Sequence, residues 1–181
     1  MTGQSRRLIA AVVGGNAASP TLLAAAEAIG AGLVDAGLRV ATGGLGGVMA
    51  AASKGARLAS GWTDGSVIGV LPGLQATAAN PFVDLAVPTG MNYARNTILV
   101  ALADVVIAVG GGSGTLSEIA LAWQHGKPIV VLDLGEGWSA RLADEQLDQR
   151  REDRLHRATS AAEAVHLGVH LAGTREVSRG F

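Results

Sequence analysis

Three clusters of glycine follow short apolar runs in this 181-residue chain, and each could bring backbone N–H groups close to a ligand. The apolar runs are typical of buried strands, and helical patterns follow the second and third clusters. A helix that begins at such a turn presents free N–H groups and the positive end of its dipole to an anion. Residues 110–115 (GGGSGT) form the best candidate for a phosphate cradle, and residues 43–47 (GGLGG) form the next best. We therefore expect an anionic, phosphorylated ligand.

The candidate phosphate-binding residues are Gly14, Gly15, Gly43, Gly44, Gly46, Gly47, Gly110, Gly111, Gly112, Ser113, Gly114 and Thr115. Tight turns between strands and helices also use glycine without any ligand, and for the pair Gly14-Gly15 alone both interpretations stay open.

Arg95 and Glu118 stand out because charged residues are few between residues 40 and 133. Arg95 falls in the first turn of a predicted helix, where a cation opposes the helix dipole, so stability alone would not favour it. Its alternative interpretation is a surface arginine that extends its charge into solvent. Glu118 follows Thr115 by three positions, which fits either a capping box or a carboxylate close to a sugar attached to the phosphate. Together the two residues are our candidates for a catalytic pair.

Several familiar motifs are absent or incomplete. The chain has no GxxxxGK[ST] sequence, which excludes a P-loop, and Thr115 stands where the serine-hydrolase motif GxSxG requires glycine. The GxGxxG pattern begins at Gly112 but ends at Ser117. Asp133, at the end of the next predicted strand, keeps an NAD-binding site open as a further alternative.

A metal site is not expected. The chain contains no cysteine, which excludes disulfides, thiolate ligands and a cysteine nucleophile. Glu163, His166 and His170 share one face of a predicted helix, but no other ligand accompanies them. We interpret them as a solvated face.

The order of elements predicts how these residues are positioned. Apolar runs alternate with helical patterns, which is typical of a Rossmann-like, three-layer α/β domain with a mostly parallel sheet, here a single domain over residues 1–181. In such a sheet, ligands bind at the carboxyl ends of the strands, where the glycine clusters lie. Strands are predicted at 8–14, 38–42, 66–71, 82–88, 104–109 and 128–133, and helices at 20–36, 48–59, 92–103, 115–125 and 160–171. Ser19 is expected to cap the first helix and Asn92 the third, while residues 74–81 form a loop and residues 141–157 a solvated helix face or loop.

The overall charge argues against two classes of partner. A net charge of −1 favours neither nucleic acid nor an anionic membrane, and no apolar run approaches the ~18 residues of a membrane span. The sequence Ser5-Arg6-Arg7 before the first apolar run could begin a short export signal, or it could be a basic turn that leads into the first strand. We favour the turn, and hence a cytoplasmic protein.

Two segments together resemble the LOG superfamily of Rossmann-like proteins, which was long mislabelled "lysine decarboxylase". They are residues 91–96 (MNYARN) and residues 103–118 (ADVVIAVGGGSGTLSE). The resemblance extends over about residues 8–133, and residues 43–49 match the earlier GGxxGxM loop of the family. It implies that Met91, Asn92 and Asn96 belong to the ligand site together with Arg95 and Glu118.

Two branches of that superfamily imply two functions. The hydrolase branch, whose PGGxGTxxE motif falls on residues 110–118, cleaves nucleoside 5′-monophosphates into free base and ribose 5-phosphate. By this resemblance, Glu118 would stabilise an oxocarbenium-like ribose or orient water, and Arg95 would assist the departing base. Gly110 replaces the proline of the motif, however, and Asn96 replaces the usual lysine. These departures are more similar to the branch of the molybdenum-cofactor carrier proteins, which bind a phosphorylated pterin.

The leading hypothesis is therefore a carrier-like binding protein for a phosphorylated, nucleotide-like ligand, either molybdenum cofactor or a nucleoside monophosphate. A phosphoribohydrolase and an NAD-binding protein are the alternatives. No cofactor is expected to be required. The resemblance further implies a homo-oligomer, a dimer or a tetramer.

Overall fold

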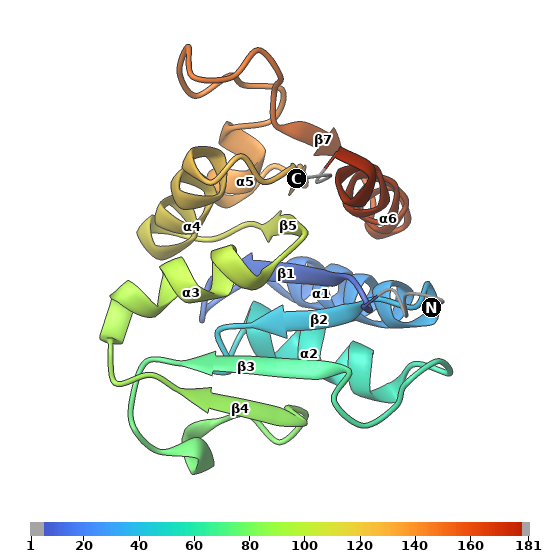
Figure 1. The fold of residues 1–181 in the computed structure, drawn as a ribbon, viewed down its shortest axis with the longest axis vertical. Helices are drawn as coiled ribbons and strands as arrows, with labels where there is room; N and C mark the ends of the chain where they lie inside the picture. The colour runs from blue at the N-terminus through green and yellow to red at the C-terminus, as the bar shows by residue number, and fades with distance from the viewer. Residues whose placement is uncertain (1–5, 179–181) are drawn as a thin grey trace.

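The computed structural model describes residues 6–178, with side chains as far as residue 174, and contains a seven-stranded sheet between two helical layers (Figure 1). Every strand pair is parallel, and the strand order is β4-β3-β2-β1-β5-β6-β7. The predicted Rossmann-like α/β fold with a mostly parallel sheet is confirmed. The strands are β1 (Ile9–Gly14), β2 (Arg39–Thr42), β3 (Val67–Leu71), β4 (Leu85–Pro88), β5 (Val105–Val109), β6 (Ile129–Leu132) and β7 (His156–Ala158). The α-helices are α1 (Pro20–Asp35), α2 (Val48–Leu58), α3 (Arg95–Leu102), α4 (Ser113–Gln124), α5 (Gly137–Arg141) and α6 (Ala161–Ser178), and the short 3-10 helices are η1 (Ala76–Ala78) and η2 (Asn92–Ala94).

The chain order changes direction beside β1, which lies between β2 and β5. The first four strands extend from β1 toward one edge of the sheet, and the chain then crosses to β5 on the other side. Such a switch point opens a crevice at the carboxyl ends of the two central strands. Gly14 at the end of β1 pairs with Val109 at the end of β5, so the first and third glycine clusters begin side by side.

Two apolar cores cover the two faces of the sheet. One contains buried residues of α1, α2 and α6, and the other contains buried residues of α3 and α4. The central strands β1, β5 and β6 supply alternate residues to both cores, which is why their sequences are continuous apolar runs.

Helices α1 and α2 pack so closely that two glycines are required where they cross. A Cβ atom on Gly30 would lie 2.0 Å from the carbonyl oxygen of Ala52, and one on Gly55 would lie 1.8 Å from that of Glu27. Part of the high glycine content is therefore explained by helix packing alone.

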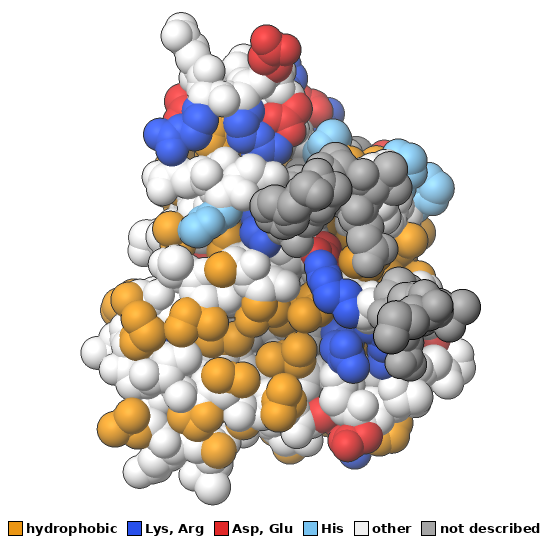
Figure 2. Space-filling view, in the orientation of Figure 1, with side chains coloured by type: hydrophobic (Ala, Val, Ile, Leu, Met, Phe, Trp, Pro, Cys, Tyr) orange, Lys and Arg blue, Asp and Glu red, His pale blue; other side chains and the backbone are white. Residues whose placement is uncertain are grey.

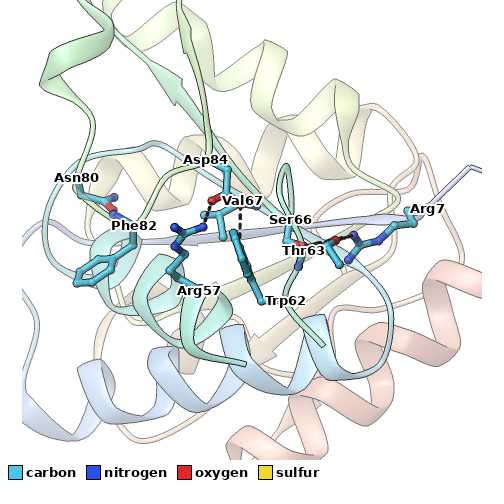
Figure 3. Close-up of polar contacts among 9 residues, drawn as sticks. All are labelled: Arg7, Arg57, Trp62, Thr63, Ser66, Val67, Asn80, Phe82 and Asp84. Carbon is cyan, nitrogen blue, oxygen red and sulfur yellow. Dashed lines mark hydrogen bonds and ion pairs between the residues drawn. The ribbon is translucent and has the colours of Figure 1, made fainter. Parts of the chain in front are cut away.

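The edge of the sheet at β4 is fastened by Asp84 (Figure 3). Its carboxylate accepts hydrogen bonds from Arg57 Nη1 at 2.7 Å, from Trp62 Nε1 at 3.0 Å and from the backbone N–H of Val67 at 2.9 Å. The Arg57 guanidinium also stacks 3.8 Å from the centre of the Trp62 ring. These contacts join the end of α2 to β3 and to the start of β4.

The structure corrects several predicted boundaries. Asn92 does not cap a helix: it lies in η2 with φ +50°, and α3 begins at Arg95 without a side-chain cap. Helix α4 begins at Ser113, two residues before the predicted start, and α6 extends to Ser178. Ser19 does cap α1, because its Oγ accepts the N–H of Leu22 at 3.3 Å.

Two elements, α5 and β7, were not predicted. The five residues of α5 and the three of β7 are too short to carry a helical or alternating pattern. Helix α5 ends where the charged segment 141–157 begins, and β7 starts at the end of this segment. The rest of the segment forms the loop between them (Figure 1).

The basic pair near the start of the chain is part of the fold. Arg6 forms an ion pair with Asp104, and Arg7 donates to the carbonyl oxygens of Gly37 and Leu38. Ser5 lies outside the described residues. Within residues 6–178, no helix has the length and apolar character needed to cross a membrane.

Candidate functional site

A pocket of about 290 Å³ opens at the carboxyl ends of β1 and β5, where the sheet changes direction. It is formed by the loop after β1, the first turn of α2, the start of α3 and the start of α4. Its lining residues are Gly14, Gly15, Asn16, Met49, Tyr93, Arg95, Asn96, Gly112, Ser113, Gly114, Thr115 and Glu118.

The start of α4 supplies the N–H groups for an anion. Its N-cap residue is Gly112, which has no side chain to accept from the first-turn amides. A Cβ atom added to Gly112 or Gly114 would meet nothing within 4 Å, so the protein leaves open space above this turn. The first turn of α4 can therefore accept a phosphate without displacing any side chain of the protein.

The turn that leads into α4 is held from behind by α5. The Oγ of Ser139 accepts the N–H of Gly110 at 2.7 Å and donates to the carbonyl oxygen of Leu132 at 2.6 Å. The N–H groups of Ser139 and Trp138 donate to the carbonyl oxygens of Gly110 and Gly111, both at 3.1 Å. Because Gly110 and Gly111 adopt φ values of +58° and +85°, these contacts fix a backbone path that other residues rarely follow.

Arg95 and Glu118 meet on the floor of the pocket. Arg95 Nη1 lies 3.2 Å from Glu118 Oε1, and the two side chains are only 11% and 7% exposed. Burial raises the pKa of the Glu118 carboxyl to about 7, although the charge and hydrogen bond of Arg95 act in the opposite direction. Near neutral pH the carboxyl is therefore divided between a form that accepts a proton and a form that donates one.

This pair overturns two of the alternative interpretations. The capping box is wrong, because α4 begins with Gly112 as its N-cap and Glu118 contacts Arg95 instead of a helix end. The solvent-directed arginine is also wrong, because Arg95 is buried.

Asn96 offers an unused hydrogen-bond acceptor. Its Nδ2 donates to Ser117 Oγ at 3.0 Å, and Ser117 Oγ in turn donates to the carbonyl oxygen of Gly114 at 2.7 Å. Because the Ser117 hydroxyl hydrogen is committed to Gly114, the orientation of the Asn96 amide follows from the network. Its Oδ1 is buried and has no hydrogen-bond partner among the described residues, while Asn96 is one of the residues that line the pocket. Such a buried acceptor suits a ligand that brings a donor.

The glycines of residues 43–47 support the pocket from outside it. A Cβ atom on Gly43 would lie 2.5 Å from Arg95 Nη2, and one on Gly47 would lie 2.3 Å from the carbonyl oxygen of Gly15. This turn therefore makes room for the Arg95 guanidinium and for the loop after β1, and a direct part of these glycines in phosphate binding stays a prediction.

The structure thus brings together only part of the predicted set. Gly14, Gly15, Arg95, Asn96, Gly112, Ser113, Gly114, Thr115 and Glu118 line one pocket, whereas Gly43, Gly44, Gly46, Gly47, Met91, Asn92, Gly110 and Gly111 do not line it.

Three lining residues were not predicted: Asn16, Met49 and Tyr93. Met49 and Tyr93 lie inside the two segments that carry the family resemblance, and Asn16 directly follows a glycine pair. In the sequence, only their position within or beside these motifs indicated a role. The fold is needed to show that these residues line the pocket.

The remaining candidates lie elsewhere. Asp133 forms an ion pair with Arg157 at 2.7 Å and is not among the lining residues, so it lends no support to an NAD site. Glu163 accepts from the N–H and Oγ1 of Thr159 and so caps the start of α6. In the part of the chain that is described, no three His, Cys, Asp or Glu residues are grouped as metal ligands.

Comparison with solved structures places the chain beside molybdenum-cofactor proteins. The molybdenum cofactor binding protein of Rippkaea orientalis is 38% identical with a TM-score of 0.77, over 90% of this chain and 95% of that one. The molybdenum cofactor carrier protein of Chlamydomonas reinhardtii is 34% identical with a TM-score of 0.77, over 92% and 99% of the two chains. DNA processing protein A of Streptococcus pneumoniae, at 21% identity and a TM-score of 0.67, shares the fold alone.

Sequence relatives include hydrolases. The cytokinin riboside 5′-monophosphate phosphoribohydrolase of Mycobacterium tuberculosis is 35% identical over an alignment of 130 residues that covers 65% of this chain and 67% of the relative. An uncharacterized protein of Archaeoglobus fulgidus is 41% identical over 104 residues, and the match spans 58% of this chain and 66% of that protein. Residues 7–165 match the sequence model of the SLOG cluster4 family, so the chain belongs to this family.

Proposed function

We propose that this protein binds a phosphorylated, nucleotide-like small molecule and acts as a carrier of the molybdenum-cofactor-carrier type. The observation that supports this is the uncapped start of α4, which faces open space in a pocket that Arg95, Asn96 and Glu118 also line. One end of this arrangement suits an anion and the other suits a hydrogen-bond donor. Both groups occur in a pterin phosphate and in a nucleoside monophosphate.

In this proposal, the N–H groups at the first turn of α4 hold the phosphate, and the hydroxyl of Thr115 contributes a further donor. Arg95 lies beside the phosphate site and favours an anionic ligand, while its own charge is balanced by Glu118. The match to carrier proteins of known structure over at least 90% of this chain supports a carrier over a hydrolase.

Equilibrium binding of AMP, GMP and a pterin phosphate tests the proposal. We expect at least one to bind below millimolar concentration, and we expect Gly114→Ala to weaken that binding, since the added methyl group occupies space that only a ligand would use. Gly73→Ala is the matched control, because Gly73 also has open space around it but lies outside the pocket. Absence of binding by all three compounds would refute the proposal.

A nucleoside 5′-monophosphate phosphoribohydrolase is the second candidate, favoured by the raised pKa of Glu118 beside Arg95. In that reaction the bond between C1′ and the base nitrogen breaks, and a water oxygen bonds to C1′. The ionised Glu118 would stabilise positive charge at C1′ and take a proton from the attacking water. The departing base would take up one proton from solvent, and Glu118 would return its own proton to solvent. The products would be the free base and ribose 5-phosphate.

Chromatography of AMP incubated with the protein distinguishes this candidate. A hydrolase would release adenine, and both Glu118→Gln and Arg95→Ala would abolish that release while the fold is retained by circular dichroism. Adenine release that is unchanged in both variants would reject these catalytic roles.

We further propose that copies of the chain associate into a dimer or a tetramer. Hydrophobic side chains gather over α3, β3 and β4 on the face seen in Figure 2. Exposed large residues from this part of the chain include Leu74, Leu85 and Met91, and such a cluster is typical of an interface. Light scattering during size-exclusion chromatography measures the mass directly, and a monomer at all concentrations would contradict the proposal.

A further inference from the structure

A second pocket, of about 240 Å³, adjoins the candidate phosphate site, and Tyr93 and Arg95 line both. Its other lining residues are Leu45, Pro72 and Asn92, which carry no charge. The two pockets therefore share the wall formed by Tyr93 and Arg95, and the other residues of the second pocket are uncharged. A ligand that spans both would place its phosphate in the first pocket and an uncharged group in the second.

The walls of the second pocket are held in place by hydrogen bonds. The N–H of Asn92 donates to the carbonyl oxygen of Pro72 at 3.0 Å, which ties the loop before α3 to the loop after β3. Asn80 donates its N–H to the carbonyl oxygen of Gly44 at 2.8 Å and its Nδ2 to that of Leu45 at 3.1 Å. Because both loops are fixed within the protein, the pocket is formed before a ligand arrives.

Arg95 and Tyr93 suit a flat ring. The guanidinium of Arg95 extends from Glu118, which it contacts through Nη1, to the Gly43 turn, which its Nη2 approaches so closely that a Cβ atom there would clash. This planar cation therefore lies at the junction of the two pockets. Tyr93 is 85% exposed, so its ring has little contact with the rest of the protein. Aromatic rings and guanidinium planes both stack on heterocycles.

We propose that the pocket of Leu45, Pro72, Asn92, Tyr93 and Arg95 binds the planar heterocycle of the ligand whose phosphate lies at the start of α4. This inference rests on the proposed function and specifies the second half of the ligand. A heterocycle uses the stacking surfaces of Tyr93 and Arg95 as well as the apolar walls, whereas an alkyl chain would use only the walls.

Calorimetric titration of the full chain compares ligands with and without a ring. The probes are AMP, 6-hydroxymethylpterin phosphate, and ribose 5-phosphate, which has a phosphate and a sugar but no ring. At least one ring-bearing probe is expected to bind about ten-fold or more tightly than ribose 5-phosphate. Each mixture is checked by chromatography for released base, so that hydrolysis does not distort the comparison.

Substitutions locate the source of that difference. Tyr93→Ala is expected to remove most of the advantage of the ring, measured as the ratio of the affinity for a ring-bearing probe to that for ribose 5-phosphate, and Tyr93→Phe is expected to keep this ratio because the ring remains. Since Tyr93 is highly exposed, neither substitution disturbs packing. Leu58→Ala is the matched control, because Leu58 is 68% exposed but lies outside both pockets.

Three results would overturn the assignment in different ways. If the ring-bearing probes and ribose 5-phosphate bind equally, or if Tyr93→Ala weakens them alike, the heterocycle does not occupy this pocket although the phosphate site stands. If octyl phosphate binds more tightly than both ring-bearing probes, the occupant is an alkyl chain. If none of the phosphorylated probes binds, the proposed function fails, and the heterocycle assignment fails with it.

Discussion

The carboxylate of Glu118 contacts the guanidinium of Arg95 at 3.2 Å although 23 positions separate them, because the first turn of α3 and the second turn of α4 meet at the same pocket. The pair is buried, and that burial makes the ionisation of Glu118 costly.

Glu118 should make stability depend on pH. Its pKa is raised from an ordinary 4.5 to about 7. Between pH 4.5 and about 7, the folded state therefore keeps a proton that the unfolded state has released. The resulting stability is fully present below pH 4.5 and is lost as pH rises through 7, by about 3 kcal/mol at most. Urea denaturation at pH 5 and pH 8 should show a smaller decline for Glu118→Gln than for the unsubstituted protein. Glu152→Gln, at an exposed carboxylate, should leave the decline unchanged, and an equal decline in all three proteins would contradict the prediction.

Ser139 should stabilise the turn before α4. Ser139→Ala removes two short hydrogen bonds and leaves the N–H of Gly110 and the carbonyl oxygen of Leu132 without them, at a cost of about 1–3 kcal/mol in the free energy of unfolding. Binding of the phosphorylated ligand should weaken as well. Ser60→Ala, at an exposed hydroxyl bonded to Asp35, should cost at most about 0.5 kcal/mol. Equal unfolding free energies of the two variants would be evidence against this role of Ser139.

Asp84 should be the main attachment of the β4 edge. Asp84→Ala leaves Arg57, Trp62 and the N–H of Val67 without their shared acceptor, and we expect a loss of about 2–4 kcal/mol. Hydrogen exchange should accelerate first at the N–H of Val67 and along β4. Protection that stays unchanged at these positions would show that the strand pairing alone holds the edge.

Asn96 should separate binding from stability. Its Oδ1 has no partner to lose within residues 6–178, so Asn96→Leu should reduce the free energy of unfolding by only about 1 kcal/mol, the contribution of its contact with Ser117. Affinity for the phosphorylated ligand should fall about five-fold or more, because the ligand donor loses its acceptor. If calorimetry finds unchanged affinity, Asn96 does not contact the ligand.

Much of the fold could be predicted because the periodicity of apolar residues and the positions of glycines indicate most of its strands, helices and turns. The buried strands β1, β5 and β6 are continuous apolar runs, and helical patterns follow β1 and β5. The elements α5 and β7 have no such pattern. Strand β7 is the polar sequence HRA, whose place at the sheet edge depends on pairing with β6.

The candidate site was predictable in its residue types more than in its geometry. Arg95 and Glu118 were noticeable because they are isolated charges, but their contact depends on how α3 and α4 meet over the sheet. Residues 43–47 were expected to bind phosphate as residues 110–115 were, since the two glycine runs look alike in sequence. Only the structure shows that the first of them lies against Arg95. The functional roles of all these residues stay predictions.

The crossing of α1 and α2 has a consequence for how this chain tolerates mutation. Gly30 and Gly55 contact backbone, so any side chain there would push the two helices apart. Gly112 and Gly114 face open space, and a methyl group there would leave the protein intact. A saturation library should therefore lose variants at positions 30 and 55 when cells are sorted for protein abundance. Variants at positions 112 and 114 should persist in that sort and disappear only when the library is sorted for ligand capture.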